Sequence, residues 1–359
     1  MNKKDYICVV PFSALEIHDH KSFLCCPSWL TKHLPSGLSG IESWNHEDAK
    51  EIRDSILDGS YKYCDEGQCP YLAELKDRTT GRIRPLFHKN ELSSEFKKVI
   101  EQHKTTGKIP PPQTVQFSFD RSCNLECPSC RVKMFIADSK KIKEVQLTID
   151  EITKKWSKFI KVLYITGSGD PFISVGFRNF LRTFDKKKYP KIENIHLHTN
   201  ATRWNKEMWE SMPHVHEFVK SCEISIDAGT KETYENKTRI NGNWDELIEN
   251  LKFIATIPNL QNVKLSFVVQ KYNYKEMTVF YETMKEIFKH KKTLKIFFGK
   301  INNWGTFSNE EFKEHEVDRK DHPEYSNFVE EFNKVFPNKY IFTNLQQHLI
   351  NKRPKSVLI

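Results

Sequence analysis

Three cysteines stand close together in the run Cys123-Asn-Leu-Glu-Cys127-Pro-Ser-Cys130. Their thiolates can hold three irons of a cubane iron–sulfur cluster and leave the fourth iron open. An open iron is a place where a substrate or cofactor can bind, whereas a closed set of four cysteines is more often structural or an electron relay. The alternative is a zinc knuckle, which generally needs a fourth Cys or His at a suitable spacing. No His lies within several residues of the triplet.

The length of 359 residues allows one large domain or two moderate ones. Lys and Arg number 56 against 47 Asp and Glu, without a dense basic block, which is more typical of a lysine-rich composition than of a nucleic-acid-binding surface. The apolar run near the N-terminus is too short for a signal peptide, and nothing approaches a membrane span. Nine cysteines, an odd number, fit a reducing cytosol and metal ligation better than a disulfide framework. We therefore expect a cytoplasmic protein.

From Thr114 onward, β-rich runs alternate with amphipathic helical patterns, which predicts parallel βα units and an α/β fold. The first helix is expected to begin at Thr148, because Thr148 and Glu151 have the spacing of a capping box. Six strands are predicted, at 114–119, 162–168, 192–200, 217–227, 262–270 and 294–301.

The cysteine triplet resembles the signature of the radical S-adenosylmethionine (radical SAM) superfamily, although Ser129 stands where that family usually has an aromatic residue. The core of this family is a partial (βα)6 TIM-like barrel, and the six predicted units support the resemblance independently. In such barrels the chemistry lies at the C-terminal ends of the strands. The resemblance implies a 4Fe-4S cluster held by Cys123, Cys127 and Cys130, with S-adenosylmethionine bound at its open iron.

The predicted strand ends carry the residues that the resemblance assigns to the cofactor. Gly167-Ser-Gly-Asp-Pro171 looks like the family's Gly-Gly-Glu-Pro element, which binds the methionine amino group, with Ser168 and Asp170 as departures. Ser225 and Asp227 share a face of a strand and can both reach a ribose, or can instead cap the following helix. The complete set of expected cofactor contacts is Gly167, Ser168, Gly169, Asp170, Asn200, Ser225, Asp227, Arg239 at the carboxylate, and Val269 beside the adenine.

The N-terminal cysteines form a second group, with Trp44, Arg53 and Gly59 between them. This pattern resembles one half of the SPASM or twitch auxiliary-cluster modules of radical SAM enzymes, although those modules normally follow the barrel. Four cysteines in two separated pairs can ligate a second 4Fe-4S cluster, or a structural zinc ion. The chosen ligands are Cys8, Cys25, Cys64 and Cys69, with Cys26 as the alternative to Cys25.

The expected organisation has four parts. Residues 1–77 form the small Cys-rich cluster-binding module, and 113–303 form the partial barrel. Residues 78–112 read as a linker, because consecutive prolines at its end favour an extended chain. Residues 304–359 form a C-terminal extension with helical periodicity around 325–336.

Together these features predict a radical SAM oxidoreductase that activates C–H bonds. It is expected to cleave S-adenosylmethionine reductively to a 5′-deoxyadenosyl radical and to abstract a hydrogen atom from a small-molecule or carbohydrate-type substrate. This class is favoured because the chain starts with the cluster module, whereas peptide-modifying relatives often start with a leader-binding domain. The alternatives are a maturase of a ribosomal peptide or protein and a non-catalytic Fe–S or zinc protein that binds a partner. An electron donor such as flavodoxin or ferredoxin is expected, and neither a membrane nor a nucleic acid.

Overall fold

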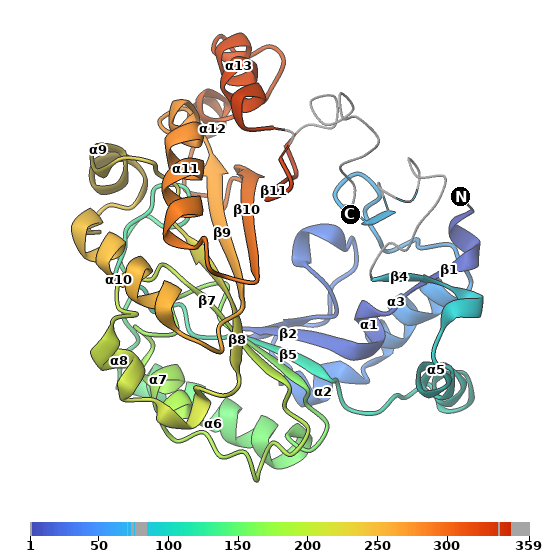
Figure 1. Cartoon of the computed structure of the whole chain (residues 1–359). Helices are drawn as coiled ribbons and strands as arrows, with labels where there is room; N and C mark the ends of the chain where they lie inside the picture. The colour runs from blue at the N-terminus through green and yellow to red at the C-terminus, as the bar shows by residue number, and fades with distance from the viewer. Residues whose placement is uncertain (1, 70, 73–74, 76–84, 337, 346–359) are drawn as a thin grey trace. The chain divides into compact units, whose positions relative to one another are not determined.

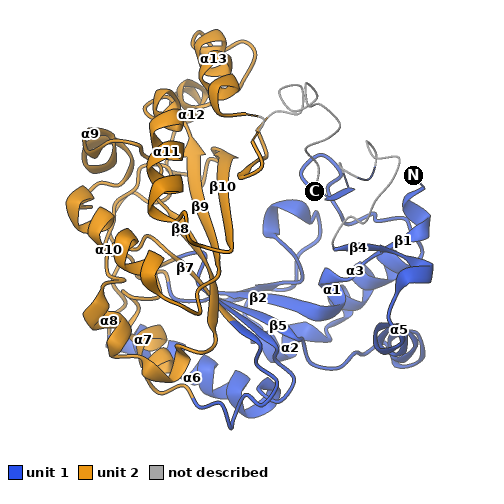
Figure 2. Cartoon of the chain, viewed as in Figure 1, with its two compact units in different colours: residues 1–120, 139–168, 185–194 blue, residues 121–138, 169–184, 195–359 orange. Residues whose placement is uncertain are grey.

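The structure is a computed structural model that describes residues 2–69, 71–72, 75, 85–336 and 338–345 (Figure 1). The chain divides into two compact units (Figure 2). The first unit contains residues 1–120, 139–168 and 185–194, and the second contains residues 121–138, 169–184 and 195–359. No helix in the described part of the chain is long and apolar enough to cross a membrane.

The sheet strands of the first unit follow the order β3 (Lys21–Phe23), β2 (Ala14–His18), β5 (Thr114–Ser118), β6 (Val162–Ile165). β2 pairs in parallel with β5, and β5 with β6, whereas β3 is antiparallel to β2. Val115, Phe117 and Leu163 are fully buried, so the apolar strand sequence builds the core of this unit.

The remaining elements of the first unit surround this sheet. β1 (Tyr6–Cys8) and β4 (Leu86–His88) form a separate antiparallel pair. The described helices are α1 (Val10–Ser13), α2 (Gly40–Trp44), α3 (Glu47–Leu57), α5 (Ser94–Thr106), α6 (Ser139–Trp156) and the short turns η1 (Lys3–Asp5), η2 (Pro27–Trp29) and η3 (Lys89–Glu91).

The second unit contains parallel strands in the order β7 (Asn194–Thr199), β8 (Val219–Ser225), β9 (Asn262–Val269), β10 (Thr293–Lys300), β11 (Ile341–Thr343). Most residues of β9 are buried, and its Phe267 packs against Phe280 of α11 with ring centroids 4.9 Å apart. Its helices are α7 (Val175–Arg182), α8 (Lys206–Glu210), α9 (Lys231–Thr233), α10 (Trp244–Thr256), α11 (Met277–Ile287), α12 (Asn309–His315), α13 (Tyr325–Val335), the turns η4 (Pro213–Val215) and η6 (Tyr274–Glu276), and the π-helical turn η5 (Tyr234–Thr238).

All six predicted strands are present within a few residues of their expected ends, as β5 to β10, and the α/β class with a parallel sheet is confirmed. The predicted helix around 325–336 is α13. Five further strands in the described part of the chain were not predicted, namely β1, β2, β3, β4 and β11. β2 lies in the region expected to be a separate N-terminal module, yet it adds a parallel strand beside β5, and β11 extends the sheet beyond β10.

Two expectations about helices and linkers are wrong. Helix α6 begins at Ser139, and Thr148 lies inside it, where its hydroxyl donates to the carbonyl oxygen of Glu144 at 3.1 Å. An interior threonine with this bond imitates a capping residue in the sequence. The expected linker contains β4 and the 13-residue helix α5, which Ser93 caps at its start and Gly107 ends with a φ of 70°. Residues 78–84 of that linker lie outside the described residues.

Candidate metal centre and cofactor pocket

The loop that follows β5 carries the cysteine triplet, and its backbone is fixed at several points. The amide of Cys123 donates to the carbonyl oxygen of Phe135 at 2.8 Å, and the amide of Cys130 donates to that of Cys127 at 2.9 Å. Cys123 and Cys127 are buried, whereas Cys130 is exposed. Burial raises the pKa of the Cys123 thiol to about 11 and also raises that of Cys127, so a metal must displace the protons to bind here.

Each of these three sulfur atoms has one nitrogen donor from a side chain of the second unit. Asn200 Nδ2 lies 3.5 Å from Cys123 Sγ, Arg239 Nη1 lies 3.3 Å from Cys127 Sγ, and Arg131 Nη2 lies 3.7 Å from Cys130 Sγ. Two of the donors are cationic, and such hydrogen bonds favour the charged, thiolate form of cysteine. The donor set therefore fits an anionic iron–sulfur cluster held by the three thiolates.

Arg131 was not predicted as a site residue. Its guanidinium also donates to the backbone oxygen of Arg121 at 2.8 Å, which ties the two ends of the cysteine loop together. A basic residue directly after the third cysteine was the signal in the sequence, because it can reach the sulfur of its neighbour.

Asp170 and Asn200 lie together in the second unit. Asp170 Oδ2 accepts hydrogen bonds from Thr199 Oγ1 at 2.7 Å and from the amide of Asn200 at 2.8 Å, and Oδ1 accepts from the amide of Phe172 at 2.9 Å. The carboxyl group is fully buried, and this burial raises its pKa. Through this bonding Asp170 positions the backbone of Asn200, whose side chain contacts Cys123.

The other residues of this turn are divided between the units. Gly169 belongs to the second unit with Asp170, whereas Gly167 and Ser168 belong to the first. A Cβ at Gly167 would lie 2.7 Å from Gln116 Nε2, so the group closest to this glycine is a protein side chain. Ser168 Oγ donates to the backbone oxygen of Ser118 at 2.6 Å.

Asp227 and Arg239 form a buried ion pair with 2.6 Å between Asp227 Oδ2 and Arg239 Nη2. Asp227 follows β8 in the left-handed region, at a φ of 58°, and its Oδ1 accepts from the amide of Val268 at 2.7 Å. It does not cap the following helix, because Thr230 is the residue that caps α9. Burial raises the pKa of Asp227, and Arg239 and the Val268 amide oppose that effect.

Three further residues complete this region. Ser225 Oγ lies 3.1 Å from Nε2 of His198 on the neighbouring strand, and Val269 is buried at the end of β9. Asn273, which was not predicted, donates from Nδ2 to the backbone oxygens of Asp227 and Val268 at 2.9 and 2.8 Å. A buried asparagine in a loop carries no pattern by which the sequence could have identified it.

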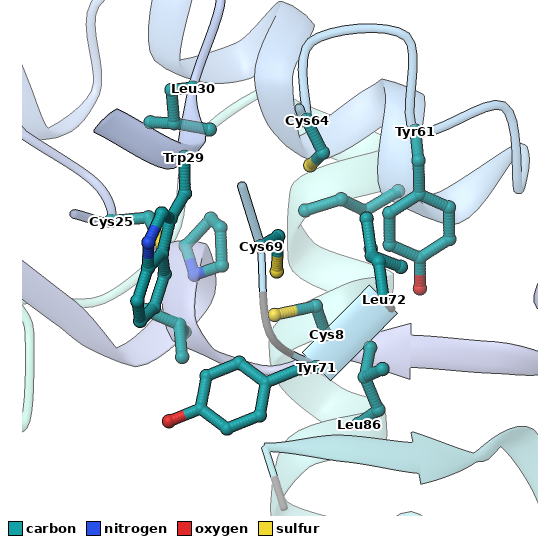
Figure 3. A pocket seen from close by; sticks show the side chains of 13 residues that line it. Cys8, Cys25, Trp29, Leu30, Tyr61, Cys64, Cys69, Tyr71, Leu72 and Leu86 are labelled. Atoms are coloured by element: carbon teal, nitrogen blue, oxygen red, sulfur yellow. The ribbon is translucent and has the colours of Figure 1, made fainter. Parts of the chain in front are cut away.

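The four chosen N-terminal cysteines line one pocket in the first unit, whereas Cys26 is not among its lining residues (Figure 3). Cys8 ends β1 opposite Leu86, the amide of Cys64 donates to the Tyr61 carbonyl oxygen at 2.9 Å, and that of Cys69 donates to Asp65 at 2.8 Å. Figure 3 shows Trp29, Tyr61 and Tyr71 among the walls of the pocket.

The thiols of this pocket raise one another's pKa. Burial raises the pKa of Cys8 and of Cys64 to about 12, and Cys69 adds to the increase in both. Burial also raises the pKa of Cys25, with Cys8 and Cys69 as further causes. Across the described residues, no three His, Cys, Asp or Glu side chains have the arrangement that a single metal ion needs.

Trp44, Arg53 and Gly59, which the sequence pattern singled out, make close contacts within the N-terminal region. Arg53 is fully buried, donates to the backbone oxygens of Pro11 and Trp44 at 2.8 and 2.7 Å, and lies 4.5 Å from the Trp44 ring. Gly59 has a φ of 77°, and a Cβ there would lie 2.9 Å from the Cα of Lys4. These contacts fix the segment just after Cys8 against α3.

Comparisons with known proteins locate the site within a family. A sequence model of the Radical SAM superfamily matches residues 117–284, which include the cysteine triplet, Asp170, Asn200, Asp227 and Arg239. No curated protein matches the chain.

Similar solved structures include Streptococcus suis SuiB bound to S-adenosylmethionine, at 15% identity and a TM-score of 0.46, covering 88% of this chain and 65% of SuiB. SuiB bound to the precursor peptide SuiA is 12% identical with a TM-score of 0.45, covering 97% of this chain and 73% of that one. Native anSMEcpe with bound AdoMet and Cp18Cys peptide is 15% identical with a TM-score of 0.42, covering 65% and 63%. The chain thus spans less than two thirds of the length of the first of these structures. Residues 117–284, which hold the cysteine loop, thus match the Radical SAM superfamily, and this family implies a 4Fe-4S cluster and S-adenosylmethionine for radical chemistry.

Proposed function

We propose that the chain is a two-cluster radical SAM enzyme that reductively cleaves S-adenosylmethionine and removes a hydrogen atom from a polar small-molecule or carbohydrate-type substrate. The observation that carries this proposal is the triplet of cysteines, each with its own nitrogen donor. When bound, the cluster supplies the electron that breaks the sulfonium bond of the cofactor. The protein holds the cluster with Cys123, Cys127 and Cys130 and orients the cysteine loop.

The buried polar residues of the second unit support the predicted cofactor contacts to different degrees. Asp170, Asn200, Asp227 and Arg239 all lie within hydrogen-bonded groups that include a cysteine of the triplet or its donor. Asp170 and Asp227 already use both carboxylate oxygens within the protein. We infer that these two carboxylates form the rigid wall of the cofactor pocket and hold its donors in place, alongside any contact of their own with the cofactor.

The proposal of a second cluster rests on the N-terminal pocket. A set of four converging thiols can supply every ligand of a 4Fe-4S cluster, and it leaves no open iron. The pocket is lined by Cys25 and not by Cys26, which favours Cys25 as the ligand. Such a fully ligated cluster suits electron transfer or structural support of the surrounding loops. A structural zinc ion is the alternative to be tested, although among the described residues no three His, Cys, Asp or Glu side chains have the arrangement that a single ion needs.

A polar substrate is supported by one face of the sheet in the second unit. His196 and His198 of β7 face Ser221 and Ser225 of β8, with 2.8 and 3.1 Å between the bonded atoms. Further along this face, Lys264 of β9 lies 3.0 Å from Glu223 of β8. Burial would raise the pKa of Glu223, but the charges of His198 and Lys264 and the Ser266 hydroxyl lower it to about 2. The face thus presents charged and neutral donors and acceptors, which suit a substrate rich in hydroxyl groups.

The test of the enzyme class is the formation of 5′-deoxyadenosine from S-adenosylmethionine by the anaerobically reconstituted and reduced protein. Cys127→Ala is expected to abolish this product, and Cys222→Ala is the matched control, because Cys222 is a buried cysteine of β8 outside both cysteine sets. Undiminished 5′-deoxyadenosine from Cys127→Ala would overturn the proposal. Absence of the product from the wild-type protein, despite bound iron, would favour the non-catalytic partner-binding alternative.

The substrate class is tested by deuterium transfer. A sugar carrying deuterium on its carbon atoms is expected to label the 5′-deoxyadenosine, whereas a ribosomal peptide with deuterated side chains is not. Label from the peptide alone would replace the carbohydrate-type substrate by the maturase alternative. The same experiment with Glu223→Gln and Lys264→Met identifies whether the polar face binds the sugar, because each change removes one charge of the pair.

A further inference from the structure

The hydroxyl group of Tyr234 is buried without a hydrogen-bond partner. Tyr234 is fully buried, and no described residue accepts from or donates to its Oη atom. A phenol hydroxyl that is removed from water and left unpaired costs free energy, so native proteins rarely retain one without a reason. Such a group calls for an explanation, for example a bound ion or a role in redox chemistry.

The charged groups around this hydroxyl are those of the cluster site. Burial raises the pKa of Tyr234, and the groups that act on it next are Arg239, Cys127, Asp227 and Cys123. The backbone shows the same neighbourhood, because the amide of Glu126 in the cysteine loop donates to the carbonyl oxygen of Ile240 at 3.0 Å, and Arg239 Nη1 lies 3.3 Å from Cys127 Sγ.

A π-helical turn and the close packing of a glycine hold Tyr234 in place. Residues Tyr234–Thr238 form a π-helical turn, and the amide of Arg239 donates to the Tyr234 carbonyl oxygen at 2.8 Å. Such turns occur often at functional sites. Gly242 closes the loop over the ring, since a Cβ there would lie 2.5 Å from Tyr234 Cε1 and 2.8 Å from the Arg239 carbonyl oxygen. The turn thus places Tyr234 next to Arg239, whose guanidinium contacts the sulfur of Cys127.

We propose that Tyr234 donates its hydroxyl hydrogen bond to a sulfur atom of the 4Fe-4S cluster held by Cys123, Cys127 and Cys130, and thereby raises the reduction potential of that cluster. The reduced cluster carries one more negative charge than the oxidised one, so a donor at its sulfur stabilises the reduced form more. Tyr234 then acts as a positioning and tuning residue beside Arg239. The inference rests on the proposed function, because it requires the cluster to be present.

The test is a redox titration of the reconstituted full-length protein, followed by electron paramagnetic resonance without S-adenosylmethionine. Tyr234→Phe removes the hydroxyl and keeps the ring. We expect about a tenfold fall in the ratio of reduced to oxidised cluster at a fixed potential, which is about 59 mV for a one-electron couple. The signal of the other cluster is recognised in the triple variant of Cys123, Cys127 and Cys130 to Ala.

Tyr274→Phe is the matched control. Tyr274 is also a buried tyrosine of the second unit, but its hydroxyl donates to Glu324. This change should leave the cluster potential unaltered and lower the stability of the chain. Tyr234→Phe should lower the cluster potential. It should leave the resistance of the metal-free chain to urea equal or higher, because it removes an unpaired polar group.

Each other outcome has a definite meaning. An unchanged potential in Tyr234→Phe overturns the inference, and so does a metal-free Tyr234→Phe chain that unfolds more easily than wild type, since the hydroxyl then has a structural partner. A shift that occurs only with S-adenosylmethionine bound also overturns it, by assigning the hydroxyl to the cofactor. Failure of the wild-type chain to bind iron at the triplet would instead disprove the proposed function, and iron analysis of the same samples separates the two failures.

Discussion

The carboxylate of Asp227 lies 2.6 Å from the guanidinium of Arg239, and the same guanidinium lies 3.3 Å from the sulfur of Cys127. One arginine thus connects the end of β8 to the cysteine loop. Arg239 Nε also donates to the carbonyl oxygen of Ile226 at 3.3 Å, so the guanidinium has three partners. The end of the strand and the cluster ligand are therefore held by the same side chain, with little freedom to move independently.

Asp227→Asn should destabilise the chain, because it leaves the Arg239 charge buried without its counter-ion. Removal of one partner from a buried pair costs about 3–5 kcal/mol, and both side chains are almost entirely buried. Urea unfolding measures this loss. The double variant Asp227→Asn/Arg239→Gln should be less destabilised than the sum of the single variants, since the unpaired charge is gone. Additive effects in this double-mutant cycle would show that the pair is not coupled.

Iron content should separate the two sets of cysteines. After anaerobic reconstitution we expect about eight irons per chain, four for each cubane. The triple variant Cys123/Cys127/Cys130→Ala should keep about four of them in the N-terminal pocket. Zinc with no residual iron in this variant would convert the pocket to a structural metal site and remove an electron-transfer role for it.

The sequence predicted the parallel sheet well because its signals are local. The runs that became β5 to β10 are apolar, rich in β-branched and aromatic residues, and bounded by helical patterns, so each strand is visible without knowledge of its neighbours. β2 was missed for the opposite reason. It is five residues long, and its pairing with β5 joins segments about 100 residues apart, which no local pattern reports.

The site was predictable where residue type alone defines the chemistry, and less so where geometry does. The cysteines could be chosen from their spacing. The contacts of Asn200 and Arg239 with these sulfur atoms could not, because the two residues come from segments that meet the cysteine loop only in the fold, whereas Arg131 follows Cys130 directly and was overlooked. Tyr234 had no signal at all, since an unpaired hydroxyl is a property of its surroundings and not of the sequence.

Stability should depend on pH through His196, whose pKa burial lowers to about 4, with a further contribution from His198. Glu223 opposes this effect and Lys264 adds to it. An unfolded histidine titrates near pH 6.5, so as the pH falls from about 6.5 to about 4 the unfolded chain takes up a proton that the folded chain does not. The free energy of unfolding should therefore fall by about 3 kcal/mol over this window.

Urea unfolding at pH 7 and pH 4 checks this dependence. His196→Gln should show a smaller loss of stability on acidification than the wild-type protein, because the glutamine side chain does not titrate. His214→Gln is the control, since His214 is an exposed histidine on the same unit, and its pH dependence should match the wild type. If all three proteins lost the same free energy of unfolding between pH 7 and pH 4, the fold would not keep the His196 ring neutral.

The neighbouring cysteines of the N-terminal pocket give a matched pair of variants. Cys25 lines the pocket, whereas Cys26 does not, and the Cys26 sulfur lies 3.2 Å from the Ser28 hydroxyl. Cys25→Ser should therefore lose about four irons per chain, and Cys26→Ser should keep both clusters. Iron and sulfide analysis measures the difference, and the two proteins differ from each other only in which of the two adjacent thiols is removed. The reverse pattern would make Cys26 the ligand and require the 25–26 segment to turn when the cluster binds. Loss of iron in neither variant would mean that either thiol can replace the other.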